Sequence, residues 1–472
     1  MNKQKIINLI EKYNIRFINV RFIDLPGVQQ HLNIPVQMFL DTVIDDGLAF
    51  DGSSINGFQT IDQSDLKLTP DLDTVYVDPF KKQPTLAISF SVVDPITNQA
   101  YAKDPRQVAF KTEKYLKSSG IADQAWFAPE AEFYIFDDIR FNTSINEGYY
   151  KIDSTEGAWN TGTYYDEGNS GHRPKIKGGY FPVPPIDQTA DIRDKIVVNL
   201  QNAGFSIERS HHEVGTAGQQ EINYKFSTLT RAADDLMTFK YIVKNTCFKE
   251  DKTATFLPKP LFDDNGSGMH CHQSLWKDGK SLFFDKNKYG QLSDIARWYI
   301  GGIIRHAPSI LAFTNPTTNS YRRLVPGFEA PTYLVYSERN RSAAIRIPIT
   351  GSSPAAKRIE FRIPDPSSNP YLAFSAQILA GVDGILNKIE PPKPVDENLY
   401  AMSAKKLSRI KTVPNSLEES LEALDKDKDF LLAGDCFTQN LIDTWIDYKY
   451  TNEIEYLRVR PTPGEFELYF DI

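Results

Sequence analysis

Asn265-Gly-Ser-Gly-Met-His-Cys-His-Gln-Ser274 is the stretch around which the rest of the chain can be interpreted. A glycine-rich turn leads into a segment in which polar and apolar residues alternate, as they do along a strand whose side chains point to opposite faces in turn. The polar side chains expected on one face are His270, His272, Ser274 and Trp276. The apolar ones expected on the other face are Met269, Cys271 and Leu275. The pattern predicts a site supported by a core, and the alternative is a strand whose two histidines have no function.

The composition is typical of a globular protein with two or three domains. The 472 residues are 41% hydrophobic and 24% charged, which suffices for a large core. A net charge of −8 argues against a nucleic-acid partner. Three widely spaced cysteines favour a reducing compartment over a disulfide framework. Because no apolar run reaches the length of a signal peptide or of a membrane span, we expect a cytoplasmic protein without a membrane partner.

Breaks in the hydrophobic pattern divide the chain into two parts. Residues 15–23 and 28–34 predict a hairpin around Leu25-Pro-Gly27, and the Asp104-Pro105 breaker follows further strand signals. We therefore expect a small α+β domain at residues 1–103 and a larger domain at residues 104–472. Helices are expected in the larger domain at 105–119, 187–203, 230–250, 291–311, 369–389 and 442–459, the last followed by an irregular tail. Residues 139–188 show little periodicity and are expected to form a long loop.

Carboxylates recur at alternate positions in strand-like segments. Glu130 and Glu132 interrupt an otherwise aromatic strand, and Glu213 and Glu221 flank a glycine-bracketed turn that predicts a hairpin. Unpaired carboxylates rarely lie in such strands unless a cation compensates them. A solvated strand edge is the alternative for the first pair. Since His211 and His212 are adjacent in the chain, at most one of them can point at the same site as these acids, and surface histidines are the alternative.

Arginines concentrate in three clusters at residues 321–329, 339–346 and 357–362. In the last cluster, Arg358, Glu360 and Arg362 alternate with apolar residues and share one strand face. Arginine matches carboxylate and phosphate oxygens in a bidentate manner, whereas an isolated surface ion pair contributes only about 0–1 kcal/mol. Three such clusters close together predict a binding site for an anion.

These groups together indicate a metal-dependent reaction of a nucleotide. Five carboxylates and one imidazole need cations to share a pocket, and this donor set favours Mg²⁺ or Mn²⁺ over zinc. Two or more ions beside arginines suit a nucleoside triphosphate, although the P-loop and the kinase motifs are absent. The sequence therefore predicts a transferase or ligase that uses ATP. The six expected metal ligands are Glu130, Glu132, Glu213, Glu221, His270 and Glu360.

Six motifs make the chain resemble the type I (bacterial-type) glutamine synthetases along nearly its whole length. They are Phe50-Asp-Gly-Ser-Ser54, Ala128-Pro-Glu-Ala-Glu-Phe133, Asn265-Gly-Ser-Gly-Met-His-Cys-His272, Arg323-Leu-Val-Pro-Gly-Phe-Glu-Ala-Pro331, Asn340-Arg-Ser-Ala-Ala-Ile-Arg-Ile-Pro348 and Arg358-Ile-Glu-Phe-Arg-Ile-Pro-Asp-Pro366. The resemblance implies an α+β fold with a small N-terminal β-grasp domain and a large α/β catalytic domain, in which an antiparallel sheet forms the active-site wall. It also implies a homododecamer of two hexameric rings with shared active sites.

The resemblance further implies roles for individual residues. One metal would be held by Glu130, Glu213 and Glu221, and the other by Glu132, His270 and Glu360. Glutamate would contact Asn265, Gly266, Arg323, Glu329, Arg341 and Arg362. ATP would contact Glu208, His272, Gln273, Ser274, Arg341, Arg346 and Arg358. The residues that would act in catalysis are Asp51 of the adjacent subunit, Glu329 on a flap, and Arg341.

The implied reaction joins ammonium to L-glutamate through γ-glutamyl phosphate at the expense of ATP. The alternatives are a γ-glutamyl-amine or polyamine ligase of the same superfamily and a relative without catalytic activity. Two departures from the family pattern stand out. Ala355 replaces a lysine that lies near the phosphates in many relatives. Tyr400 matches a tyrosine that is adenylylated in some relatives, but its flanking residues lack the usual acids, so an unmodified surface tyrosine is the alternative.

Overall fold

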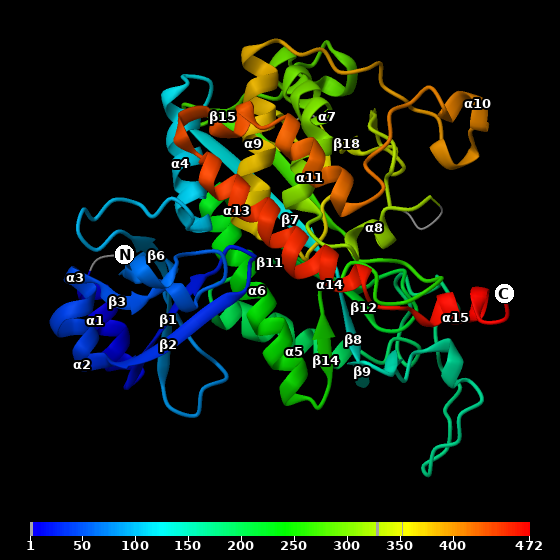
Figure 1. Cartoon of the computed structure of the whole chain (residues 1–472), viewed down its shortest axis with the longest axis horizontal. Helices are drawn as coiled ribbons and strands as arrows, with labels where there is room; N and C mark the ends of the chain where they lie inside the picture. Colours follow the sequence, from blue (N-terminus) through cyan, green and yellow to red (C-terminus); the bar gives the residue numbers. More distant parts are fainter. Residues whose placement is uncertain (1–2, 327–329, 352) are drawn as a thin grey trace.

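The computed structural model describes residues 3–326, 330–351 and 353–472. A small N-terminal domain, in blue, lies at the left of Figure 1, and the rest of the chain forms a larger body beside it. The C-terminal helix, in red, lies at the opposite side of this view. Within the described ranges, no helix has the length and apolar character needed to cross a membrane.

The small domain is built on one sheet with the strand order β2-β1-β6-β4-β3, and β5 pairs with β6. The expected hairpin is confirmed, because β1 and β2 pair antiparallel on either side of a turn in which the Asp24 carboxylate accepts hydrogen bonds from the amides of Gly27 and Val28. The strands are β1 (Phe17–Ile23), β2 (Gln29–Pro35), β3 (Leu48–Asp51), β4 (Asp65–Pro70), β5 (Tyr76–Val77) and β6 (Thr85–Val93), and the α-helices are α1 (Lys3–Lys12), α2 (Val36–Met38) and α3 (Ile44–Asp46).

Two sheets organise the larger domain. The first has the order β13-β7-β15-β19-β18-β17 with β16 beside β15, and the second has the order β11-β12-β8-β14. The first sheet is the expected wall and is antiparallel except where β17 runs parallel to β18. The strands are β7 (Gln124–Ala131), β8 (Phe133–Phe136), β9 (Asp138–Ser144), β10 (Glu147–Asp153), β11 (Ile207–His212), β12 (Gln219–Tyr224), β13 (Ser227–Thr228), β14 (Thr253–Thr255), β15 (Met269–Lys277), β16 (Lys280–Ser281), β17 (Tyr336–Glu338), β18 (Ile345–Ile347) and β19 (Ile359–Phe361).

The helices begin at the capping residues that the sequence supplies. Asp104, Asn369 and Ser416 each accept a hydrogen bond from a backbone amide in the first turn of the helix that follows, which satisfies a donor with no partner inside the helix. The α-helices of this domain are α4 (Pro105–Ser118), α5 (Ala190–Asn202), α6 (Leu229–Lys249), α7 (Asp294–Thr314), α8 (Ser320–Arg323), α9 (Pro370–Leu386), α10 (Ala404–Leu407), α11 (Leu417–Lys426), α12 (Asp429–Leu432), α13 (Gln439–Lys449), α14 (Glu455–Arg458) and α15 (Pro463–Tyr469).

The apolar face of β15 packs into the main core, as the alternation predicts. Met269, Cys271 and Leu275 are fully buried, and they share one hydrophobic cluster with residues of α6, α7 and α9. Phe127 of β7 stacks on Phe374 of α9 with 4.7 Å between ring centroids. Helices α6, α7 and α9 cover this apolar face of the wall. Since side chains alternate along a strand, His270, His272 and Ser274 point to the opposite face.

Two expectations about irregular segments are wrong. Residues 139–188 contain the hairpin of β9 and β10, whose side chains are largely exposed on both faces and therefore show no alternation. The expected tail after residue 459 contains α15, which opens with a capping box between Thr462 and Glu465. The expected helix at 442–459 is interrupted, because a π-helical turn at Tyr450–Ile454 separates α13 from α14.

A close crossing of α7 and α9 leads to a test of the packing. A Cβ atom at Gly302 would lie 2.0 Å from the carbonyl oxygen of Ala380 and 2.8 Å from the Cα atom of Gly384. Overpacking of this kind costs about 1–3 kcal/mol, so Gly302→Ala is expected to lower the free energy of unfolding in urea by that amount. Gly148→Ala is the control, since nothing lies within 4 Å of its new methyl group. Equal stability of the two variants would contradict the close crossing.

Candidate active site

The register of the wall sheet brings the polar residues of three strands together. On one side of β15, His270 lies opposite Glu130 of β7. On the other side, His272 lies opposite Glu360 of β19. Side chains that are directly opposite across an antiparallel pair have Cβ atoms about 4.5–5.5 Å apart. The pairing therefore gathers two imidazoles and two carboxylates on the face of the sheet that α6, α7 and α9 leave uncovered.

The first cluster of acids and imidazoles is centred on Glu130. Its carboxylate lies 3.5 Å from Nδ1 of His270 and 3.1 Å from Nε2 of His272, and His270 also lies 3.8 Å from Glu360. One ligand atom each of Glu130, His272 and Glu360 lie within 4.8 Å of one another. Burial, assisted by Arg362, lowers the pKa of His270 to about 4. The imidazole is therefore neutral at physiological pH and has a lone pair for a metal ion.

Two arginines hold the Glu360 carboxylate in place. Arg362 and Arg346 each form an ion pair with it, and the Glu360 side chain is fully buried. Burial by itself would raise the pKa of this carboxyl, but Arg362, the nearby histidines and Arg346 outweigh it and lower the pKa to about 2. Glu360 is thus a fixed negative charge over the working pH range of most enzymes.

The second cluster lies on the β11–β12 hairpin, which confirms the predicted turn between Glu213 and Glu221. His211 lies opposite Glu221, 3.5 Å from the Glu213 carboxylate and 4.0 Å from that of Glu221. Burial lowers the pKa of His211, and burial together with the neighbouring carboxylates raises that of Glu221 well above its usual value. As expected, only one of the adjacent histidines faces the acids. The sequence interpretation gave His211 no role, although its i, i+2 relation to Glu213 was a usable signal.

Among the described residues, Glu132 lies outside both groups of closely spaced ligand atoms and interacts with Glu213 through its charge. It follows the last residue of β7, and its carboxylate accepts hydrogen bonds from the Gly268 amide at 2.8 Å and from the Gln219 side chain at 3.3 Å. Burial and then the charge of Glu213 raise its pKa to about 8. The expected metal groupings, Glu132 with His270 and Glu360 and Glu130 with Glu213 and Glu221, stay a prediction, and the contacts in the structure pair Glu130 with His270 and Glu360 instead. The alternation of β7 ends at Glu132 because the chain leaves the wall sheet there and enters the second sheet at β8.

Four of the six expected glutamate-binding residues lie at or beside the turn before β15. Tyr134 donates a hydrogen bond to the Asn265 carbonyl at 2.5 Å, and the Gly266 carbonyl accepts one from Gln219 at 3.0 Å. Arg323 is buried and donates to the carbonyls of Ile363 and Arg362 at 2.6 and 3.2 Å. The structure therefore brings Asn265, Gly266, Arg323 and Arg362 to one end of the wall.

Most of the expected nucleotide-binding residues lie along the same face, but Gln273 does not. Arg358 donates to Nδ1 of His272 at 3.2 Å, and Ser274 accepts a hydrogen bond from Trp276 at 3.0 Å. Gln273 points to the core, where its amide donates to Gln377 at 2.8 Å and accepts from the Tyr299 hydroxyl. Its side chain is therefore not available to ATP, and the strict alternation of β15 already implied this. Glu208 and Arg341 are exposed, and Ala355 lies in the 3₁₀ turn Pro354–Ala356.

Two other expected residues, Asp51 and Tyr400, lie away from both clusters. Asp51 is exposed in the small domain, where it accepts hydrogen bonds from the Ser53 amide and from the hydroxyls of Ser53 and Ser54. These donors, the Ser53 hydroxyl foremost, lower the pKa of Asp51. Glu329 lies outside the described residues. Tyr400 is 47% exposed in the 3₁₀ turn Leu399–Ala401, which is compatible with modification and with an ordinary surface tyrosine.

Two aromatic residues that the sequence interpretation missed cover the second cluster. Tyr180 and Phe181 stack with 3.9 Å between centroids, and the His211 ring meets them edge-on at 5.8 and 4.7 Å. Burial and then the charge of Glu213 raise the pKa of Tyr180. Both residues belong to a glycine-rich segment without periodicity, so no sequence pattern pointed to them.

The donor set fits divalent cations that prefer oxygen ligands. Glu132 and Glu221 have raised pKa values because carboxylates crowd together in a buried site, and a bound cation would remove this repulsion. Neutral His211 and His270 complete two adjoining sets rich in carboxylates. Such sets suit Mg²⁺ or Mn²⁺ better than zinc.

Comparison with known proteins agrees with this geometry. The family model for the catalytic domain of glutamine synthetase matches residues 102–469, and the model for its β-grasp domain matches residues 14–95. Glutamine synthetase of Streptomyces filamentosus is 59% identical over 471 residues, covering 100% of this chain and 99% of that protein. The enzyme of Mycolicibacterium smegmatis is 57% identical over 470 residues, with 99% and 98% covered.

A solved structure shows that the likeness extends to the fold. The cryo-EM structure of Plasmodium falciparum glutamine synthetase superposes with a TM-score of 0.90 at 31% identity, and the match covers 99% of both chains. Sequence relatives, both family models and the fold agree over essentially the full length. The chain belongs to the glutamine synthetase family.

Proposed function

We propose that the protein is a ligase that forms L-glutamine from L-glutamate, ammonium and ATP with the aid of Mg²⁺ or Mn²⁺. The observation that carries this proposal is the pair of carboxylate and imidazole clusters, one on the wall sheet and one on the β11–β12 hairpin, together with the buried arginines beside the first. Full-length similarity to glutamine synthetases supports the choice of substrates.

The contacts suggest how two or more ions would be held. Glu132, Glu213 and Glu221 would bind one ion, and Glu130, His270 and Glu360 would bind the other, with His211 and His272 beside them. When bound, such ions neutralise phosphate oxygens and orient a nucleoside triphosphate for transfer. This assignment keeps all six residues expected from the sequence and exchanges Glu130 with Glu132.

The residues around the clusters would carry the two steps of the reaction. The γ-carboxylate of glutamate, held by Asn265, Gly266, Arg323 and Arg362, attacks the γ-phosphate of ATP to give γ-glutamyl phosphate and ADP. Arg341 and Arg346 neutralise the charge that develops on the transferred group. The residues proposed to hold the nucleotide are Glu208, His272, Ser274, Arg346 and Arg358.

Ammonia then displaces phosphate from the acyl phosphate to give glutamine. Asp51 would be supplied by an adjacent subunit, where it would help to remove a proton from ammonium, and its lowered pKa keeps it ionised so that it attracts the cation. Glu329 remains a prediction for the flap that would exclude water, which otherwise hydrolyses the intermediate.

The surface of the C-terminal segment supports a homo-oligomer. Leu457, Val459, Phe466, Leu468 and Phe470 are exposed. Contiguous apolar patches on soluble proteins commonly mark interaction sites. We propose a dodecamer of two hexameric rings in the cytoplasm, with each active site shared between neighbours. We further propose domains at residues 1–103 and 104–472, which is supported by a hydrophobic cluster formed entirely by residues of the first range, although Ile23 and Leu25 pack into the main cluster of the second.

An assay of product formation tests the function. We expect glutamine to form from ammonium only when ATP, glutamate and Mg²⁺ or Mn²⁺ are all present, with one ADP released per glutamine. Chromatography of the products with ammonium, methylamine and putrescine as competing acceptors distinguishes the alternatives. Turnover with an amine but not with ammonium would favour an amine ligase, and no turnover with any acceptor would favour a non-catalytic relative.

A further inference from the structure

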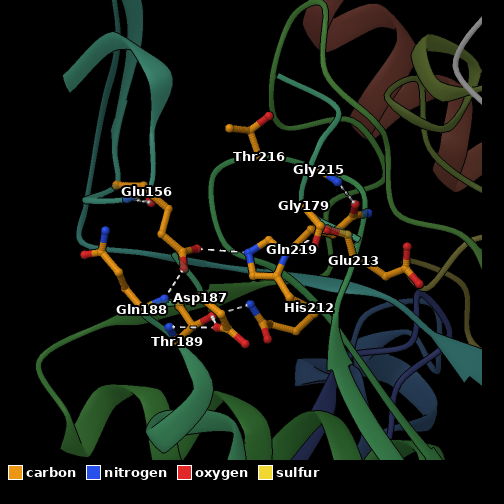
Figure 2. A network of polar contacts seen from close by, with 12 residues as sticks. Glu156, Gly179, Asp187, Gln188, Thr189, His212, Glu213, Gly215, Thr216 and Gln219 are labelled. Carbon is orange, nitrogen blue, oxygen red and sulfur yellow. Dashed lines mark hydrogen bonds and ion pairs between the residues drawn. The ribbon is translucent and has the colours of Figure 1, made fainter. Parts of the chain in front are cut away.

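His212 is next to Glu213 in the chain but belongs to a separate buried network (Figure 2). Its Nδ1 atom lies 2.7 Å from the carbonyl oxygen of Gly179 and 2.7 Å from that of Glu213. Its Nε2 atom lies 3.0 Å from the Glu156 carboxylate, and both side chains are fully buried. Since carbonyl oxygens only accept hydrogen bonds, Nδ1 donates to both of them.

The network ties three distant segments to the turn that carries Glu213. The second oxygen of Glu156 accepts a hydrogen bond from the Gln188 amide at 2.6 Å, and the Gly179 amide donates to the Val214 carbonyl at 3.1 Å. A Cβ atom at Gly179 would lie 2.4 Å from the Glu213 carbonyl oxygen and 2.7 Å from Cε1 of the His212 ring, so only glycine allows this approach. The His212 imidazole is thus held between the turn that begins at Glu213 and the segment at Gly179.

The two carbonyl groups that His212 binds both belong to segments that contact the second cluster. On one side, the carbonyl held by His212 belongs to Glu213, whose carboxylate lies 3.5 Å from His211 and accepts a hydrogen bond from the Val214 amide at 2.9 Å. On the other side, Gly179 precedes Tyr180 and Phe181, whose rings meet His211 edge-on. Removal of these hydrogen bonds would therefore release the backbone of one acid and the aromatic cover above it.

We propose that the His212–Glu156 pair is a positioning element that orients Glu213 and the segment at Gly179–Phe181 for binding of a divalent cation. The inference rests on the proposed function, since it assumes that Glu213 is a metal ligand. Neither residue of the pair reaches the cluster with its own polar atoms: the pair acts through the Glu213 carbonyl and through Gly179. Partners that orient metal ligands typically affect metal affinity or activity by about 10–100-fold.

A second buried histidine in the same chain provides a matched control. His306 of α7 bridges Asp427 and Asp383 with ring nitrogens at 2.8 and 2.9 Å, and its ring stacks on Phe430. It is a buried imidazole between carboxylates that lies outside both clusters. A purely structural role for the Glu156 pair predicts that disrupting either histidine has the same consequence.

The experiment measures Mn²⁺ affinity by electron paramagnetic resonance on the purified full-length protein, without substrates. Glu156→Ala removes the partner of Nε2 and is expected to weaken Mn²⁺ binding about 10–100-fold. Glu156→Gln can donate from its amide to a neutral imidazole whose Nδ1 still donates to both carbonyls, so it is expected to change affinity by less than about tenfold. His306→Gln is expected to lower the melting temperature and to leave Mn²⁺ affinity unchanged.

Each outcome bears on the proposal. Unchanged Mn²⁺ affinity in folded Glu156→Ala would overturn the positioning role, and so would an equal loss in His306→Gln. If Glu156→Ala does not fold, Glu156→Gln and His212→Gln decide, because His212→Gln should weaken Mn²⁺ binding while Glu156→Gln does not. Failure of the wild-type protein to bind Mn²⁺ would instead contradict the proposed function itself.

Discussion

Glu360→Ala is expected to lower kcat/KM for glutamine formation by at least about 10³-fold, equivalent to about 4 kcal/mol of transition-state stabilisation. Glu360 is the residue on which Arg346, Arg362 and His270 converge, and its pKa of about 2 keeps it charged. Its loss removes a proposed metal ligand and leaves two arginines to repel each other. Steady-state kinetics with saturating Mg²⁺ measures the effect.

Two further variants separate chemistry from folding in this test. Unpaired buried charges can cost about 3–5 kcal/mol, so Glu360→Gln, which keeps the volume and a hydrogen-bond acceptor, shows whether activity is lost in a folded protein. Glu250→Ala removes a surface carboxylate that pairs with Lys195, and it is expected to keep wild-type activity. A Glu360→Gln or Glu360→Ala enzyme with wild-type kinetics would contradict the ligand role.

Removing divalent ions with a chelator is expected to abolish turnover and to change how stability depends on pH. In the metal-free protein, burial and Glu213 raise the pKa of Glu132 from its ordinary 4.5 to about 8. The folded chain then holds a proton that the unfolded chain releases, so stability falls as pH rises through this interval. A bound cation favours the carboxylate form and reverses this preference.

The melting temperature from pH 5 to 8, with and without Mg²⁺ or Mn²⁺, measures this effect. Stabilisation by the ion is expected to increase with pH, because binding requires deprotonated ligands. Glu132→Gln is the matched variant, since it cannot lose a proton and should show a shallower pH dependence without metal. Other groups also titrate in this range, so the difference between the wild type and Glu132→Gln is the decisive quantity. No difference at any pH would show that Glu132 keeps an ordinary pKa.

Local rules were sufficient for the framework of the site. Alternation along residues 269–276 predicted which side chains of β15 enter the core and which face outward, and two helices expected at 105–119 and 369–389 begin at the caps Asp104 and Asn369. These predictions succeeded because they depend on strand geometry and on backbone amides close by in the chain. Resemblance to known motifs added the substrate class and the expected roles of individual residues.

Which partners each acid contacts could be learned only from the tertiary structure. Glu130 and Glu132 are two residues apart, yet one contacts His270 and the other contacts Gln219, because the chain leaves the wall sheet after β7 and enters the second sheet at β8. The β9–β10 hairpin shows no hydrophobic periodicity because both of its faces are largely exposed to solvent. The segment with Tyr180 and Phe181 shows none either, because these rings pack against the polar residue His211.

The sequence by itself determined the two-part α+β organisation, the polar face of β15 and the identity of the acids and arginines, because each is encoded in spacing or side-chain chemistry. Only the tertiary structure decided which acid meets which histidine and that His212 pairs with Glu156. These depend on contacts between residues far apart in the chain, such as His270 and Glu130. Packing selects such contacts among many that the chain pattern permits equally.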